Sequence, residues 1–212
     1  MAATAPLSSR ALYEEVAELL RERIFKQELK TGSWIDELRI AEELGISRTP
    51  LREALKVLAA EGLVTMKLRR GAYVTEVSER DLAEVYHLLA LLESDAASAV
   101  AEHASATQIA QLRALHQSLS AAVSDREAFF RINEAFHRQL LAIANNRWRD
   151  QMVADLRKVM KLNRHHSLLK TGRIEESLAE HAAIMQAIEQ RDPVSAAVRM
   201  REHFQNGLEA AA

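Results

Sequence analysis

The sequence predicts a mainly α-helical protein in two parts, and three observations lead to that expectation. The chain has 212 residues with only three prolines and six glycines, a composition that favours long helices. Apolar residues recur every three or four positions over most of the chain, which is the period of an amphipathic helix. That period is interrupted between Leu63 and Thr75, where two short β-prone runs flank a basic segment.

Composition excludes several classes of protein. The length fits one or two domains and is sufficient to bury a core. Because the chain has no cysteine, it cannot carry a disulfide framework, a thiolate zinc finger or a cysteine nucleophile. The opening MAATAPLSSR has no apolar core of signal-peptide length, and no run approaches the ~18 apolar residues of a membrane span. We therefore expect a cytoplasmic protein that does not enter a membrane.

The N-terminal part should contain three helices. Apolar residues at three- and four-residue spacing predict the first helix, at Leu12, Val16, Leu19, Leu20 and Ile24. Asp36 is a suitable N-cap for a short second helix, which Gly45 ends. Ser47 is the expected cap of the third helix. Pro50 falls in its first turn, where a missing amide hydrogen costs little.

A hairpin and a second group of helices should follow. The β-prone runs at 63–66 and 72–75 are joined by a basic tip, KLRRG, whose Gly71 can adopt a positive φ. After Ser78 six helices are expected, at residues 79–103, 106–123, 125–145, 147–169, 173–190 and 193–210. We therefore expect one domain at residues 1–77 and an all-α bundle at residues 78–212.

The first domain has the order of elements and the charge expected of a DNA reader. Between residues 44 and 75 the charged residues are the cations Arg48, Arg52, Lys56, Lys67, Arg69 and Arg70 and the anions Glu53 and Glu61. Such a basic segment favours an anionic partner, although a solvated surface would also explain it. The expected order of elements is two helices, a tight turn, a third helix and a two-stranded ribbon. This is the order of a winged helix-turn-helix.

Two arginines are placed to read bases. Arg48 and Arg52 look unpaired in the sequence and lie one turn apart on the third helix, so both could enter a major groove and bind guanine. The wing tip, with Arg69 and Arg70 before Gly71, could enter a minor groove or contact phosphate. For either helix arginine alone, a solvated surface position is the alternative.

A family resemblance is carried by two runs, LGISRTPLREALKVLAAEGLV and the RRGAYV that follows it. Together they resemble the N-terminal signature of GntR-family bacterial transcription regulators. The resemblance implies that Arg48 and Arg52 contact base edges. It also implies that Ser47 and Thr49 contact phosphate and that Gly71 lets the wing approach the DNA backbone.

Three of the eight histidines lie on apolar stripes of different expected helices. His137 follows Asn133 by one turn at the edge of one stripe, while His181 and His203 lie on inward faces of two later helices. A single core histidine is usually structural. Three that converge, with an amide oxygen beside them, suit a divalent metal such as zinc, nickel or manganese.

The motifs around these histidines, NxxFHxxL, EHxxIxxAI and MRxH, resemble the FCD ligand-binding domain of the FadR subgroup. Six helices suit its VanR-like branch. The resemblance implies that a metal is held by Asn133, His137, His181 and His203. The adjacent Glu180 and Glu202 are not expected to orient their histidines, because neighbours in a helix do not share a face.

This chain departs from these resemblances at three places. Leu38 stands where some members have an arginine that contacts DNA, with Arg39 beside it. Asn133 stands where metal-binding members usually have aspartate. Leu89 stands where members often have an arginine four residues before a glutamate, here Glu93. The pocket is therefore more apolar or takes its cation from elsewhere.

Together these features predict a ligand-responsive transcription regulator, with repression as the default, that binds a palindromic double-stranded DNA operator as a homodimer. Its effector would be a small carboxylate-type molecule that enters the bundle and completes the coordination of the metal. No enzymatic activity is expected. Two alternatives stay open: a metal sensor, in which the ion is the signal, and a metal-dependent hydrolase that uses the histidine site.

The two tryptophans and one histidine pair also have expected positions. Trp34 should pack within the first domain, and Trp148 in the core or an interface. The pair His165 and His166 is expected at the surface, with one ring facing the pocket as the alternative.

Overall fold

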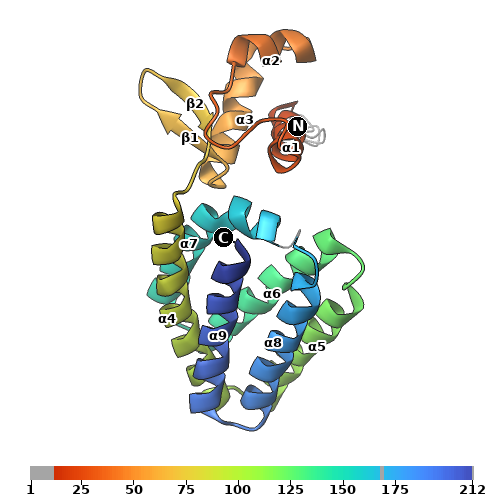
Figure 1. The fold of residues 1–212 in the computed structure, drawn as a ribbon, viewed down its shortest axis with the longest axis vertical. Helices are drawn as coiled ribbons and strands as arrows, with labels where there is room; N and C mark the ends of the chain where they lie inside the picture. Colours follow the sequence, from red (N-terminus) through yellow and green to blue (C-terminus); the bar gives the residue numbers. More distant parts are fainter. Residues whose placement is uncertain (1–11, 168–169, 212) are drawn as a thin grey trace, which may run out of the picture. The chain divides into compact units, whose positions relative to one another are not determined.

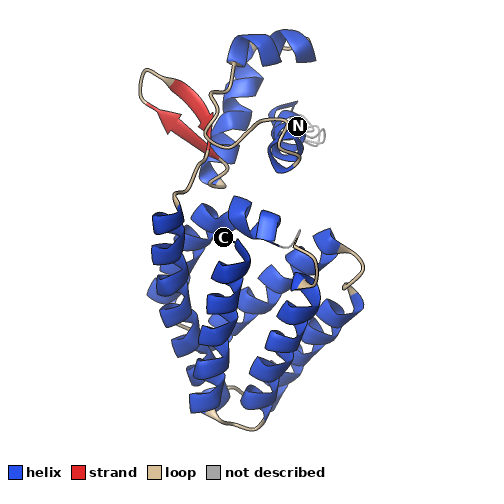
Figure 2. Ribbon diagram, viewed as in Figure 1, coloured by secondary structure: helices blue, strands red, loops and turns tan. Residues whose placement is uncertain are grey.

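The computed structural model describes the backbone of residues 12–167 and 170–211, and the side chains of these residues except 161–167. Chain contacts divide the protein into an N-terminal unit, Met1–Glu76, and a helical unit, Val77–Ala212. Over the described ranges the chain forms nine helices and one two-stranded sheet, which confirms the mainly α fold (Figure 1, Figure 2). None of the helices in these ranges has both the length and the apolar composition that crossing a membrane requires.

Three helices and a hairpin form the N-terminal unit in the expected order. They are α1 (Leu12–Phe25), α2 (Glu37–Leu44), α3 (Arg48–Ala60), β1 (Val64–Lys67) and β2 (Gly71–Val74). α1 packs against α3, and the facing apolar side chains are fully buried at Leu20, Ile24, Leu51, Leu55 and Leu58. This is a winged helix-turn-helix, with β1 and β2 as the wing beside α3 (Figure 1).

Local interactions determine where α2 and α3 begin and end. Asp36 Oδ1 accepts hydrogen bonds from the backbone N–H groups two and three residues ahead, each at 3.1 Å. Gly45 ends α2 with a φ of 63°. Ser47 has the expected cap position of α3, but its side chain accepts no capping hydrogen bond. Pro50 is the third residue of α3, where its missing amide hydrogen removes no helical bond.

The wing is a tight antiparallel hairpin whose register places Lys67 opposite Gly71. Arg69 and Gly71 have φ values of 60° and 90°, as the turn requires. Trp34 joins the wing through a β-bridge to Tyr73. A Cβ at position 71 would lie 3.0 Å from the Trp34 indole Nε1, so this position favours glycine on both counts. Trp34 is 55% exposed, so it packs against the wing surface and not in the core.

Six helices form the helical unit, and their boundaries agree closely with the expected ones. They are α4 (Glu79–His103), α5 (Ala106–Ala121), α6 (Arg126–Ala144), α7 (Arg147–Ser167), α8 (Arg173–Glu189) and α9 (Pro193–Ala211). Ser78, Ser105 and Asp125 accept hydrogen bonds from first-turn amides of α4, α5 and α6. Trp148 is 68% exposed on α7, so the expectation of a core position is wrong.

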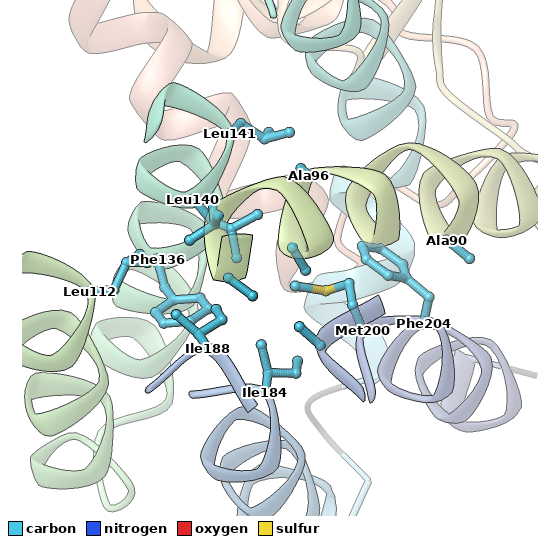
Figure 3. Close-up of a cluster of buried hydrophobic side chains, with 14 of the residues drawn as sticks. Ala90, Ala96, Leu112, Phe136, Leu140, Leu141, Ile184, Ile188, Met200 and Phe204 are labelled. Carbon is cyan, nitrogen blue, oxygen red and sulfur yellow. The ribbon is translucent and has the colours of Figure 1, made fainter. Parts of the chain in front are cut away.

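Apolar side chains from several helices meet in one core around α4. Figure 3 shows Leu112 of α5, Phe136 and Leu140 of α6, Ile184 of α8 and Met200 of α9 in this cluster, and all five are fully buried. Polar side chains are buried in the same unit, among them Glu93, Asn133, His137, His181 and His203. Because a buried polar group is costly unless it is paired, these residues mark a candidate site.

Candidate functional site

Arg48 and Arg52 share a partner, Glu37, that was not expected from the sequence. Arg52 Nε donates a hydrogen bond to Glu37 Oε2 at 2.8 Å, and Arg48 Nη2 donates to the same oxygen at 3.2 Å. The two arginine side chains are 48% and 55% exposed, whereas that of Glu37 is 14% exposed. The interpretation of these arginines as unpaired is therefore wrong. In the sequence, Glu37 stands at the start of the helix that precedes the turn, and nothing local shows that it would face the two arginines.

The surroundings of Glu37 favour the ionised form of its carboxyl group. Its burial alone would raise the pKa of the carboxyl group, but hydrogen bonds from Arg52 and Arg48 outweigh burial and lower the pKa below its usual value. Glu37 is also the first residue of α2, where the helix dipole favours a negative charge. At neutral pH this cluster consists of two cations that share one anion.

The other predicted DNA-contacting residues lie on three neighbouring elements of the chain. Ser47 and Thr49 are exposed at the start of α3. Arg39 is exposed on α2, next to Leu38, which is 58% exposed. Exposed cations at the wing tip, Arg69 and Arg70, precede Gly71. The N-terminal unit thus presents its predicted contacts from α2, the start of α3 and the wing.

The helical unit brings three histidines together from α6, α8 and α9. His137, His181 and His203 each offer a ring nitrogen, and these nitrogens all lie within 4.8 Å of one another. His137 and His181 are fully buried, and His203 is nearly so. Asn133 is buried one turn before His137 on α6. Imidazole rings at this separation, with an amide oxygen on the same helix face, form a donor set that a divalent metal can use.

Carboxylates orient two of the three rings. Glu93 Oε2 on α4 lies 2.7 Å from His137 Nδ1, and Glu180 Oε2 on α8 lies 2.6 Å from His203 Nδ1. Because an ionised carboxylate only accepts hydrogen bonds, each Nδ1 must donate, which leaves the Nε2 lone pair of that ring for a ligand. Glu180 was not expected to orient its neighbour His181, and in the structure it holds His203 of the next helix, α9.

Each orienting carboxylate is in turn held by an arginine. Arg157 Nε on α7 donates to Glu93 Oε1 at 3.0 Å. Arg173 donates two hydrogen bonds to Glu180, both at 2.8 Å. Leu89 supplies no cation on α4, and the cation beside Glu93 is Arg157 of α7. Arg173 and Glu180 stand seven residues apart, on one face of α8, and this spacing was the one available signal for the pair.

The charge states at this site are determined by burial and pairing. Burial would raise the pKa of Glu93, but Arg157 and His137 outweigh it and lower the pKa to about 2. Burial lowers the pKa of His137 to about 3, although Glu93 opposes this shift. The pKa of Glu180 is lowered to about 2, because hydrogen bonds from His203 and Arg173 outweigh its burial. At neutral pH, Glu93 and Glu180 are ionised and His137 is neutral, the state in which imidazole binds metals.

Orphaned polar atoms support a fit between these residues and a metal ion. Within the described part of the chain, Asn133 Oδ1 and His137 Nε2 are buried without a hydrogen-bond partner. Such atoms are rare in folded proteins and call for an explanation. Both lie on the face of α6 that carries the histidine cluster. The side chains of His165 and His166 lie outside the described residues.

Comparisons with known proteins give the same picture for both units. Residues 12–74 match the family described as bacterial regulatory proteins, gntR family, and residues 84–206 match the FCD domain. The uncharacterized HTH-type transcriptional regulator YdhC of Bacillus subtilis (strain 168) is 26% identical over 93% of this chain and 89% of its own length. The HTH-type transcriptional repressor RspR of Escherichia coli (strain K12) is 26% identical over 91% of this chain and 85% of its own length.

A solved structure has the same fold. The structure of E. coli McbR/YncC superposes with a TM-score of 0.72 at 23% identity and covers 96% of this chain and 98% of its own.

Proposed function

The chain belongs to the GntR family of bacterial transcription regulators and carries an FCD domain, and from this premise we propose how its two parts divide the function. Residues 1–77 read DNA. Residues 78–212 bind a small effector and hold two copies of the chain together. The wing and α3 of the first part and the buried histidine cluster of the second support this division.

DNA reading begins at α3. Arg48 and Arg52 enter the major groove and bind guanine, because their exposed guanidinium groups lie one turn apart at the start of the helix. Ser47 and Thr49 contact phosphate at the positive end of the helix dipole. The remaining contacts come from Arg39 on α2 and from the wing tip, Arg69, Arg70 and Gly71. A homodimer would place two such heads on a palindromic operator.

The effector site is centred on the histidine cluster, which is the observation that carries the proposal. His137, His181 and His203 would hold a divalent metal such as zinc, nickel or manganese, together with Asn133. When bound, such a metal supplies a Lewis-acidic position that a carboxylate oxygen can occupy. Glu93 and Glu180 fix the rings of His137 and His203 in the metal-binding orientation. Asn133 brings no charge, so a metal held here keeps more of its positive charge for an anionic effector.

Repression is the proposed mode of control, relieved when the effector binds. RspR, which aligns over most of this chain, is a repressor. An effector that prefers one arrangement of the helical part can shift the spacing of the two heads, provided that it binds the two arrangements with different affinity.

Two experiments test these assignments. Selection from random duplexes should yield a palindromic sequence, and absence of any preferred duplex would contradict the DNA-reading role. A thermal-shift screen of small carboxylates with metal analysis should reveal an effector that requires metal.

His181→Ala should lose most bound metal, because one of few ligands is removed, while exposed His87→Ala should retain it. A metal titration of DNA affinity, with and without carboxylates, separates this scheme from a metal sensor. If the ion alone changes the affinity, the ion is the signal.

A further inference from the structure

An acidic side chain, Glu37, lies inside the proposed DNA-reading surface. Its negative charge would repel the phosphates of bound DNA. Glu37 is mostly covered, and a single carboxylate oxygen accepts hydrogen bonds from both Arg48 and Arg52. Removal of a negative charge from a DNA-binding face should strengthen binding to any duplex. A carboxylate at this place therefore needs a reason other than affinity.

The hydrogen bonds to Glu37 leave the outer edge of each guanidinium available. A guanidinium has five N–H donors in a rigid fork. Arg52 uses Nε, so its bond to Glu37 leaves both Nη groups as donors. Arg48 uses Nη2 and keeps Nε and Nη1. Guanine presents two acceptors, O6 and N7, that suit a pair of N–H donors from one arginine. Arg52 can therefore bind Glu37 and guanine at the same time.

The same pairing works against contacts that carry no sequence information. Arginine reaches phosphate by swinging its flexible side chain, and such a movement would break the bonds to Glu37. It would also leave the carboxylate close to the DNA backbone without its counter-charge. A correctly placed guanine requires no such movement. Contact with phosphate is thus penalised, whereas contact with guanine is not.

We propose that Glu37 is a specificity-determining residue, which holds Arg52 and Arg48 in the base-reading orientation and weakens binding to non-operator DNA. The inference rests on the proposed DNA-reading function and adds a residue to it. A purely structural role for Glu37, as a link between α2 and α3, would instead change the stability of the unit and affect operator and random DNA equally.

The test compares Glu37→Gln and Glu37→Ala with the unchanged protein on its selected operator and on a random duplex, over a series of salt concentrations. Glu43→Gln is the matched control, because Glu43 is also on α2 and also pairs with an arginine, Arg23. It removes one negative charge without touching Arg48 or Arg52.

For Glu37→Ala we expect tighter binding to the random duplex and a steeper salt dependence, by about one unit of the log–log slope. The ratio of operator to random affinity should fall about tenfold or more, the range of a lost bidentate base contact. Glu37→Gln, which keeps an acceptor but loses the charge, should fall between Glu37→Ala and the unchanged protein. Glu43→Gln should leave the ratio within about twofold, since charge loss on α2 acts equally on both duplexes.

Two results would overturn the inference. One is a specificity ratio in both Glu37 variants equal to that of Glu43→Gln. The other is an equal loss of affinity for both duplexes with a lowered melting temperature. Failure of the unchanged protein to prefer any duplex would be a different result, because it would also remove the DNA-reading function on which the inference rests.

Discussion

Two regions of this molecule use the same chemistry, a carboxylate that holds nitrogen groups, in opposite surroundings. In the N-terminal unit, Glu37 pairs with Arg48 and Arg52, whose side chains are about half exposed. In the helical unit, Glu93 pairs with His137 and Arg157, and the side chains of this group are fully or almost fully buried. The bonds have similar lengths, so the surroundings determine what each cluster can do.

Exposure distinguishes an ion pair that a partner can rearrange from one that stays in place. Water and salt screen the arginine pairs at the surface, so such pairs typically contribute only ~0–1 kcal/mol and can be rearranged by a partner. In the interior, an uncompensated charge is costly, so the Glu93 cluster stays assembled and fixes its imidazole. The first arrangement suits recognition of DNA, and the second suits a preorganised metal site.

The largest expected effect is on the buried side of the comparison. Glu93→Gln should destabilise the helical unit by about 3–5 kcal/mol, because Arg157 would be left buried without its counter-charge. Urea unfolding followed by circular dichroism measures the loss. The double variant Glu93→Gln/Arg157→Gln should recover part of it. A change in the single variant as small as that at an exposed ion pair would contradict the contrast.

Acid should weaken the helical unit before the N-terminal unit. The pKa of His137 is lowered from 6.5 to about 3 in the fold. Below pH 6.5, His137 therefore binds a proton in the unfolded chain but stays neutral in the folded chain. Stability present above pH 6.5 is therefore lost as the pH falls towards 3. At ~1.4 kcal/mol per pKa unit, the loss is on the order of 3 kcal/mol by about pH 4. Denaturant unfolding of metal-free protein over this range measures it, and His137→Gln should flatten the dependence. Equal slopes in the two proteins would be inconsistent with a buried neutral histidine.

Arg52→Ala should weaken binding to the selected operator by about 1–3 kcal/mol, because a bidentate guanine contact is lost. Fluorescence anisotropy with labelled duplexes measures the change. Lys26→Ala is a suitable control, because Lys26 is an exposed cation just after α1 that pairs with Glu22. Unchanged operator affinity in Arg52→Ala would remove this residue from the base-reading set.

Glu180→Gln should weaken metal binding by about 10–100-fold, since loss of an orienting carboxylate usually costs that much. The reason is that Glu180 fixes the ring of His203. Competition with a metal-binding dye measures the affinity, and Glu175→Gln at an exposed position of α8 serves as control. An unaltered metal affinity would show that His203 needs no fixed orientation.

The smallest expected effect concerns the exposed cluster. Glu37→Gln should change the free energy of unfolding by less than ~1 kcal/mol, because both of its partners remain solvated. Thermal and urea unfolding would measure it. A loss as large as that expected for Glu93→Gln would remove the distinction between the two clusters.

The sequence was sufficient for features that depend on neighbouring residues and not for those that depend on helix packing. Periodicity and caps such as Asp36 and Gly45 located the helices, since these signals act within a few residues. The apolar stripes placed His137, His181 and His203 on inward faces for the same reason. Pairs across helices were missed. The partners stand 15 to 64 residues apart in three such pairs, which are Glu93 with Arg157, Glu180 with His203 and Glu37 with Arg52. At these separations no local pattern shows which side chains will face one another.

Ser47 and Trp148 show a related limit. Ser47 is a common N-cap residue in a cap position, yet its side chain makes no capping bond. Trp148 was expected in the core or an interface because large aromatic residues are usually well buried. Its 68% exposure on α7 excludes the core and leaves the interface as the expected place.

The two tryptophans provide each unit with its own optical reporter. The chain has only these two, Trp34 against the wing and Trp148 on α7, and both indoles are more than half exposed. In Trp148→Phe the remaining emission would come from Trp34, which is joined to the wing at Tyr73, and would respond to DNA bound there. In Trp34→Phe it would come from the helical unit. Operator and effector titrations could thus be followed separately in unlabelled protein.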